Sequence, residues 1–318
     1  MLDNLIFSLN AVMPIFLVMV IGFFIKRAGF FDNTGARQMN ALVFNFALPI
    51  KLFMDIFKSD MSEMMDIPLI LYSVSTNIVW FFLIWALALY IIKDRNHLGA
   101  FIQGCFRSNY AIIGLPLVAN ILDGHLPGKA AVISTFVIPL YNIMAVIVLT
   151  IYGNNKEIEI KSSVKSALRN IARNPMIIGI LLGVIFSGLK IPLPKPAVSS
   201  LNYMAELSTP LALICIGGSI DLSKVKARFK PALSVCFLKL ALMPLLFVPP
   251  AIMLGLPSDS IIILFVLFAA PTAVSSYVMV TYMGSDEALA SNILVMTSLF
   301  SVFTYTIGVY VLKSIGII

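Results

Sequence analysis

The sequence predicts an all-α polytopic membrane protein with ten transmembrane helices, arranged as two inverted five-helix repeats. Composition is the first observation behind this class. Of the 318 residues, 60% are hydrophobic and 12% are charged, and the mean hydropathy is +0.99. No soluble fold of this length needs so much apolar surface. The second observation is a series of apolar segments with short polar connections, and the third is a basic stretch that divides this series into two halves.

Ten segments come close to the about 20 apolar residues that cross a bilayer core. We expect spans over residues 5–25, 37–57, 67–92, 98–122, 128–152, 173–190, 201–220, 230–254, 259–282 and 287–312. The seventh is the weakest as a continuous helix, because Thr209-Pro210 and Gly217-Gly218-Ser219 interrupt it.

The longest connection is polar and basic, and it defines the domain organisation. Residues 1–152 are expected to form the first repeat, residues 153–172 a basic cytoplasmic linker, and residues 173–318 the second repeat. Because each half contains an odd number of spans, the two halves must cross the membrane in opposite directions, which makes them inverted repeats.

Lys and Arg residues in the loops predict the orientation. If the N-terminus lies outside, the cytoplasmic loops collect most of the loop Lys and Arg residues. The outer face then receives only Lys58, Lys129, Lys190, Lys195 and Lys313. Both termini are therefore expected outside.

The fourth span is interrupted in its middle. Arg107, Ser108 and Asn109 lie inside an otherwise apolar segment, and Gly114-Leu115-Pro116 follows. A proline removes one helical hydrogen bond and clashes with the preceding turn. Freed backbone groups at membrane depth persist only inside protein or beside water. We expect a broken helix whose second half begins at Pro116, because proline suits a first helical turn.

The ninth span is expected to break at the corresponding place. Pro210 lies 161 positions after Pro49, and the same offset carries Pro116 to position 277, within the interrupted segment 270–277. Broken helices at matching positions of two halves indicate a transport site.

Two half-helices that begin at mid-membrane bring two positive dipole ends together, and a carboxylate suits that place. The second half of the ninth span is expected to follow Ala273, with Thr272, Ser275 and Ser276 as candidate caps. Arg107 adds a full charge and a forked set of donors. It is interpreted either as a substrate contact or gate, or as a structural partner.

Three further charged residues lie within spans. Lys51 and Asp55 are four residues apart and are expected to pair locally, and a proton- or ion-coupling role for Asp55 is the alternative. Lys239 is expected either to take part in coupling or to pair with a carboxylate such as Glu206 or Asp221.

Other classes of function find little support. The basic residues are distributed over loops, so the net charge of +7 does not indicate nucleic-acid binding. No catalytic, cofactor or metal motif occurs, and the two histidines fall at span ends. An intramembrane enzyme is therefore the less favoured alternative, and a channel of similar composition stays open.

Four stretches resemble the bacterial auxin efflux carrier family, which includes malate-permease-like proteins and is related to the plant PIN auxin exporters. They are RSNYAIIGLPL (107–117), MNALVFNFALP (39–49), LKLALMPLL (238–246) and AAPTAVSSYVMVTYMG (269–284). The pattern Asn-x-x-x-x-Gly-x-Pro from Asn109 to Pro116 is the most specific part of this resemblance.

The resemblance implies that the fourth and ninth helices cross at their breaks, much as in bile acid–sodium symporters, and that Asn109 contacts the substrate. It implies a carrier of small organic anions, such as malate or other carboxylates, in a bacterial cytoplasmic membrane. No cofactor is expected beyond a coupling proton or sodium ion. A sodium-coupled symporter of the bile acid type is an alternative, and homodimer formation is a further expectation from the family. The expected substrate-binding residues are Asn109, Tyr110, Gly114, Pro116, Pro271, Thr272, Ser275 and Ser276, with Arg107, Asp55 and Lys239 for coupling or gating.

Overall fold

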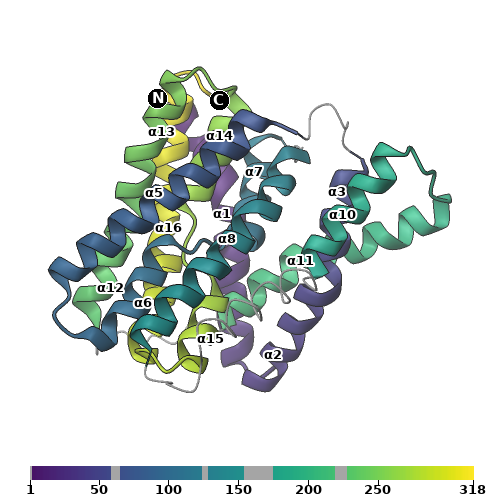
Figure 1. The fold of residues 1–318 in the computed structure, drawn as a ribbon. Helices are drawn as coiled ribbons and strands as arrows, with labels where there is room; N and C mark the ends of the chain where they lie inside the picture. The colour runs from purple at the N-terminus through teal and green to yellow at the C-terminus, as the bar shows by residue number, and fades with distance from the viewer. Residues whose placement is uncertain (1, 59–64, 124–127, 154–174, 219–227) are drawn as a thin grey trace.

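A computed structural model describes residues 2–58, 65–123, 128–153, 175–218 and 228–318, and all regular structure in these ranges is helical (Figure 1). The helices of the first half are α1 (Leu2–Arg27), α2 (Asn33–Leu42), the π-helical segment η1 (Val43–Ala47), α3 (Leu48–Phe57), α5 (Ile67–Ile91), α6 (Arg95–Phe106), the π-helical segment η2 (Tyr110–Gly114), α7 (Leu115–Ile121) and α8 (Gly128–Tyr152). Those of the second half are α10 (Pro175–Gly188), α11 (Lys195–Gly218), α12 (Phe229–Cys236), the π-helical segment η4 (Phe237–Leu242), α13 (Met243–Met253), α14 (Ser258–Ala269), α15 (Val274–Tyr282) and α16 (Glu287–Ser314).

Seven helical stretches of the described ranges are long and apolar enough to cross a membrane, and one of them is interrupted over residues 270–273. They are Leu2–Arg27, Thr34–Phe57, Ile67–Ile91, Gly128–Tyr152, Phe229–Met253, Ser258–Tyr277 and Glu287–Ser314. The chain is thus an all-helical polytopic membrane protein. The other three predicted spans correspond to the interrupted helix α6–η2–α7, to the shorter apolar helix α10, and to α11. The predicted linker lies, apart from Gly153, outside the described residues.

The prediction that Pro210 interrupts the seventh span is wrong, because α11 continues through this proline to Gly218. The helix packs against α1 on one side and α3 on another, and this packing supports the turn that lacks one hydrogen bond. At Gly217 an added Cβ atom would lie 1.8 Å from the carbonyl oxygen of Met19. The small residue therefore lets the backbones of α11 and α1 approach closely, as is usual in membranes.

Three prolines follow π-helical segments rather than breaking their helices. Pro49, Pro116 and Pro244 are each the second residue of the α-helix that continues η1, η2 or η4. The amide of Leu115, for example, bonds to the carbonyl of Tyr110, five residues back. A wider turn at this place accommodates a ring that cannot donate to the residue four back. The helix over residues 110–121 is therefore continuous at Pro116.

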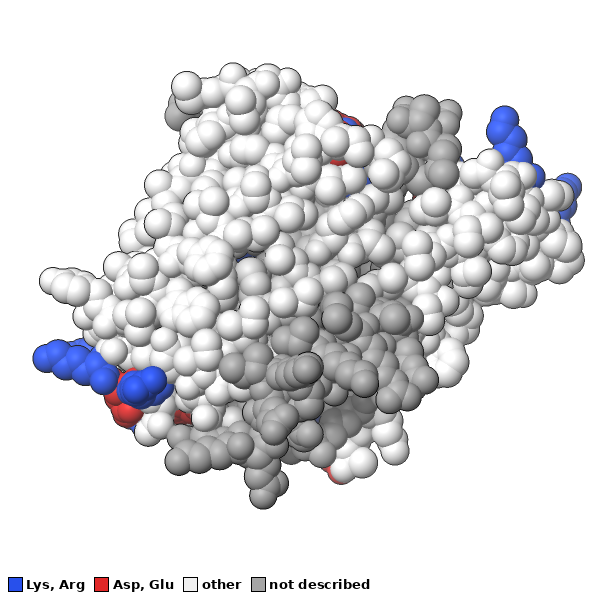
Figure 2. Space-filling model, in the orientation of Figure 1, with Lys and Arg blue, Asp and Glu red and all other residues white. Residues whose placement is uncertain are grey.

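Helices α2, α3, α10 and α11 form one group, and α5, α6, α8 and α12 to α16 form another, with α1 lying between them (Figure 1). The two ends of the chain lie together, since the Asn4 amide donates to the Ser314 hydroxyl at 3.1 Å. Charged side chains sit at the ends of the face in Figure 2, and a broad uncharged surface separates them. Exposed side chains such as Leu71, Phe82 and Leu245 are those expected on a lipid-facing surface.

Candidate functional site

Two helices break where they meet. Helix α6 ends at Phe106, and the chain is extended at Arg107 (φ −73°, ψ 130°) before it resumes a helix at Tyr110. Helix α14 ends at Ala269, and α15 begins at Val274. The ninth break therefore lies where the sequence predicts it. The fourth does not, because its second half begins at Tyr110 and not at Pro116.

The two breaks bind each other directly. The backbone N–H of Asn109 donates to the carbonyl of Pro271 at 2.8 Å. The Ser108 hydroxyl donates to the carbonyl of Leu267 at 2.9 Å, and the Thr272 hydroxyl donates to that of Gly104 at 2.8 Å. Each break thus supplies donors for backbone groups that the other leaves open, which is how irregular backbone is tolerated at membrane depth. The two broken helices therefore meet at their breaks.

Side chains from other helices complete the carboxyl end of α6. Trp80 Nε1 donates to the carbonyl of Cys105 at 2.9 Å, and Lys239 Nζ lies 3.5 Å from that of Phe106. A cation at this end also complements the negative end of the helix dipole. The predicted pairing of Lys239 with Glu206 is wrong, because Lys239 is fully buried and its polar contacts within the described ranges are the Phe106 carbonyl and the Met243 sulfur. Asp221 lies outside the described residues.

A cavity of about 60 Å³ lies against both breaks. Its lining residues are Phe44, Arg107, Ser108, Asn109, Ala111, Ile112, Ile138, Tyr141, Met176, Ala273, Val274 and Ser275. The first turns of η2 and α15 both reach it, and neither has a side-chain cap. The interpretation of Thr272, Ser275 and Ser276 as caps of α15 is therefore wrong. Two uncapped amino ends and a guanidinium make this cavity electropositive.

The Arg107 side chain is held by neutral groups. Nη2 donates to Asn142 Oδ1 at 2.8 Å and to Ser275 Oγ at 2.9 Å, and Nη1 contacts Met279 Sδ at 2.7 Å. The residue is 6% exposed, and none of the described carboxylates pairs with it. A buried charge without a counter-charge is costly. The arrangement is therefore able to bind an anion.

Two polar atoms beside the breaks have no hydrogen-bond partner within the described part of the chain. They are Asn109 Nδ2 and Ser276 Oγ, on residues that are 5% and 4% exposed. Buried donors are nearly always satisfied in folded proteins. Asn109 is also one of the residues that line the cavity.

Of the eight predicted substrate-binding residues, Asn109 and Ser275 line the cavity, and Arg107 joins them. Tyr110 instead donates from its hydroxyl to the carbonyl of Ala130 at 3.1 Å, and its ring covers Gly114. The remaining members of the predicted set, Gly114, Pro116, Pro271, Thr272 and Ser276, are not among the lining residues.

Asp55 lies on α3, where Oδ2 is 3.4 Å from Lys51 Nζ. The predicted local ion pair is confirmed. Neither Lys51 nor Asp55 is among the residues that line the cavity at the breaks.

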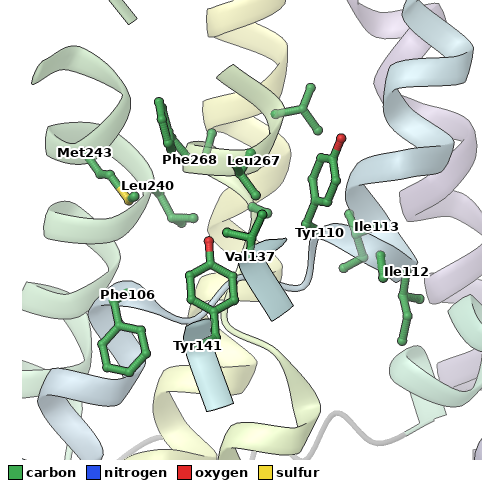
Figure 3. Close-up of a cluster of buried hydrophobic side chains, with 14 of the residues drawn as sticks. Phe106, Tyr110, Ile112, Ile113, Val137, Tyr141, Leu240, Met243, Leu267 and Phe268 are labelled. Atoms are coloured by element: carbon green, nitrogen blue, oxygen red, sulfur yellow. The ribbon is translucent and has the colours of Figure 1, made fainter. Parts of the chain in front are cut away.

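Residues from three other segments line the site without having been predicted. Tyr141 on α8 stands beside Phe106 (Figure 3) with ring centroids 6.1 Å apart, and its hydroxyl donates to Asn77 Oδ1 at 2.9 Å. Phe44 of η1 and Met176 of α10 close the cavity from the other group of helices. Asn142, the neighbour of Tyr141 on α8 and a partner of Arg107, could have indicated that α8 reaches the site, because it is an amide inside an apolar span. The aromatic and Met positions carry no such signal.

A second, open pocket of about 880 Å³ lies near the chain ends. Lys129 Nζ is 3.2 Å from Asp66 Oδ2 and 2.7 Å from Asp259 Oδ2, and the Ser260 hydroxyl donates to Asp66 at 2.9 Å. Burial of the Asp66 carboxyl opposes its ionisation. Hydrogen bonds from the Leu69 amide, Ser260 and Lys129 outweigh this effect and lower the Asp66 pKa. The cluster ties the starts of α5, α8 and α14 together.

No group of three or more His, Cys, Asp or Glu side chains is placed to hold a metal ion in the part of the chain that the structure describes. The residues at the two breaks thus bring an arginine, an asparagine and the starts of two helices to one cavity.

Comparison with known proteins places the chain among transporters. The family model described as membrane transport protein matches residues 7–309. A Rhizobium meliloti protein named "Putative malonate transporter" is 27% identical over 308 residues, covering 95% of each chain. The uncharacterized transporter YfdV of Escherichia coli K12 is 24% identical over 98% of this chain and 100% of its own length. An uncharacterized transporter of Methanothermobacter thermautotrophicus is 21% identical over 92% of this chain and 95% of its own. The chain is a member of the membrane transport protein family, the auxin efflux carrier family that its motifs indicate.

Proposed function

We propose that the protein is a secondary active carrier that moves small organic anions by alternating access at the crossing of the two broken helices. The observation that carries this proposal is the buried Arg107, which lines the cavity and has no described carboxylate beside it. A guanidinium is a strong, forked partner for a carboxylate. A substrate carboxylate would supply the missing counter-charge.

Asn109 and the two helix ends orient the anion in this proposal. The free Nδ2 of Asn109 donates to one carboxylate oxygen, and the open amides at the starts of η2 and α15 face the same cavity. Hydrogen bonds to a charged acceptor in a poorly solvated site are among the stronger ones in proteins. The substrate is thus a small carboxylic acid in its ionised form.

The cavity of about 60 Å³ is much smaller than the about 300–1,000 Å³ of typical ligand pockets. Binding therefore requires the two groups of helices to separate. Phe44 and Met176 belong to the group that contains α3 and α10, whereas Arg107 and Ser275 belong to the other. Movement of one group against the other would open the cavity to one face at a time.

The proposal includes ten spans in two inverted repeats, residues 1–152 and 173–318, joined by a basic cytoplasmic linker over 153–172. The 161-residue offset supports it, because it carries α5 (67–91) to 228–252, close to the stretch Phe229–Met253, and α8 (128–152) to 289–313, inside α16. The distribution of Lys and Arg residues supports both termini outside a bacterial cytoplasmic membrane. Homodimer formation belongs to the same proposal.

Transport would be driven by a proton or sodium gradient, by the membrane potential or by exchange. Lys239, which lies at the carboxyl end of α6, and Asp55 are the candidate coupling groups, and Arg107 is the candidate gate. Malonate is among the candidate substrates, because one relative is named a putative malonate transporter.

Uptake by purified protein in proteoliposomes tests the proposal. Labelled malate, citrate, malonate and indole-3-acetate are offered separately, with and without imposed pH, sodium and voltage gradients. Saturable uptake of at least one acid, driven by one gradient or by exchange, is the expected result. Folded protein that moves none of the four acids under any gradient or in exchange would contradict the proposal.

A further inference from the structure

The donors of Arg107 are unequally satisfied. Nη2 donates to two oxygen atoms, Asn142 Oδ1 and Ser275 Oγ, whereas the partner of Nη1 is the thioether sulfur of Met279 at 2.7 Å. A thioether is a weak acceptor that carries no charge. The Nη1 side of a buried guanidinium is therefore occupied by a group that an oxygen anion outcompetes.

A second donor points at the same sulfur atom. Gln103 Nε2 lies 3.9 Å from Met279 Sδ, and Gln103 is fully buried with its Oε1 lacking a hydrogen-bond partner. Gln103 lies in the last turn of α6, and Arg107 is the residue that directly follows this helix. Ser275 and Met279 are four residues apart on α15, which places them on one face of that helix. The two helices lie side by side at the end of the molecule away from the termini (Figure 1).

We propose that Arg107 Nη1 and Gln103 Nε2 form a carboxylate subsite, and that the sulfur of Met279 occupies it until a substrate carboxylate displaces it. The inference rests on the proposed function and adds a residue that determines affinity. Two N–H donors converging on one position match the two oxygens of a carboxylate. An acid with two carboxylates can place one here and the other in the cavity beside Asn109.

The side chain of Met279 has properties that allow it to occupy the proposed subsite temporarily. Its unbranched side chain has three rotatable bonds and adapts to irregular space, so the sulfur can leave Nη1 without a movement of the α15 backbone. While it remains, it fills the volume beside a buried cation. Leucine has a similar volume and no acceptor, and glutamine has a similar length and a strong acceptor.

The test compares wild type with Met279→Leu, Met279→Gln and Gln103→Leu in proteoliposomes, and measures KM and Vmax for labelled malonate and the melting temperature of each protein. Met279→Leu frees Nη1 and should lower KM. Met279→Gln places a permanent oxygen there and should raise KM. Gln103→Leu removes one donor and should also raise KM. Each change should be about three- to tenfold, the effect of one hydrogen bond. Met283→Leu, one turn further along the chain, is the control and should keep the wild-type KM; Met283 is buried, whereas Met279 is partly buried.

The two Met279 variants should shift KM in opposite directions at similar melting temperatures. A Met279 side chain that only packs against its neighbours would not produce this result. Saturable malonate uptake with the same KM in wild type and in both Met279 variants would overturn the subsite and leave the proposed function standing. Absence of uptake of all four acids by folded wild-type protein would overturn the proposed function and the subsite together.

Discussion

The backbone N–H of Asn109 donates a hydrogen bond to the carbonyl of Pro271 across 2.8 Å, and this bond joins the breaks of two helices from different halves of the chain. With the bonds from Ser108 to Leu267 and from Thr272 to Gly104, it makes the crossing one connected unit. A substrate bound at this place would therefore contact one connected unit and not two loops that move independently.

Replacing Asn109 with alanine should abolish most transport and leave the fold intact. Asn109 Nδ2 has no hydrogen-bond partner among the residues that the structure describes, so its removal breaks none of the hydrogen bonds seen there. Loss of a hydrogen bond to a charged ligand costs about 1.5–3 kcal/mol, which is about 10- to 100-fold in Vmax/KM. Uptake and melting temperature are the two measurements.

Asn120→Ala is the matched control for this variant. The Asn120 amide donates to the carbonyl of Ala11 at 3.0 Å and ties α7 to α1. Its loss should lower the melting temperature and keep KM. Normal uptake by the Asn109→Ala protein would remove this residue from the site.

Arg107→Lys should also lose transport, by about 10-fold or more in Vmax/KM, although the charge is kept. Lysine cannot reproduce the fork that contacts Asn142, Ser275 and Met279 together. Vmax/KM for the transported acid is the quantity to compare. Wild-type kinetics in the lysine variant would show that Arg107 is a structural residue and not a substrate contact.

Thr272→Val should lower stability without a change of KM. The hydroxyl donates to the carbonyl of Gly104 at the end of α6 and does not line the cavity. Loss of a buried hydrogen bond costs about 1 kcal/mol. Thermal unfolding in detergent measures the loss, and an altered KM with an unchanged melting temperature would return Thr272 to the substrate site.

Pro116→Ala should leave uptake close to that of wild type. The break lies at residues 107–109, whereas Pro116 follows the π-helical segment η2 in a continuous helix. Alanine there does not repair the break. A clear fall in the transport rate, at unchanged protein stability, would mean that the π-helical turn itself takes part in the cycle.

The pH dependence of stability should reflect Asp66. Its folded-state pKa is lowered from the usual value of 3.8, so the ionised form stabilises the fold above that pH. The stabilisation is lost as the pH falls through the lower, folded-state value. Asp66→Asn keeps a residue able to cap α5 and removes the charge. The melting temperature of wild type should exceed that of the variant at pH 7, and the gap should close below pH 3.8. A gap that stays constant down to the lowest accessible pH would contradict this role.

Particular residues show how far the sequence predicts this molecule. The lengths of the apolar segments were sufficient to predict the helical class. The interrupted segment that ends at Ala273 was sufficient to predict the break in the ninth span. Pro116 and Pro210 were misleading, because a wider helical turn or close packing accommodates a proline, and neither is visible in a single sequence. The polar triplet Arg107-Ser108-Asn109 was the better marker of the fourth break.

The candidate site could be predicted only in part, because the sequence shows which residues are polar and not which way their side chains point. Arg107, Asn109 and Ser275 stand out as polar groups at membrane depth, and all three line the cavity. Tyr110 and Thr272 are polar as well, but their hydroxyls bond to backbone carbonyls. Which way a polar side chain turns depends on the neighbouring backbone, and the order of residues does not specify it.

Labelling of a single cysteine would test most directly whether an anion binds between the two breaks. Val274, the first residue of α15, lines the cavity, whereas the native Cys105, Cys215 and Cys236 are buried. The Val274→Cys protein is treated with a small thiol reagent in the presence and absence of the transported acid, with wild type as the control. We expect the acid to slow labelling at the concentration that half-saturates uptake. Labelling that proceeds at the same rate with and without the acid, in protein that still transports it, would place the substrate elsewhere.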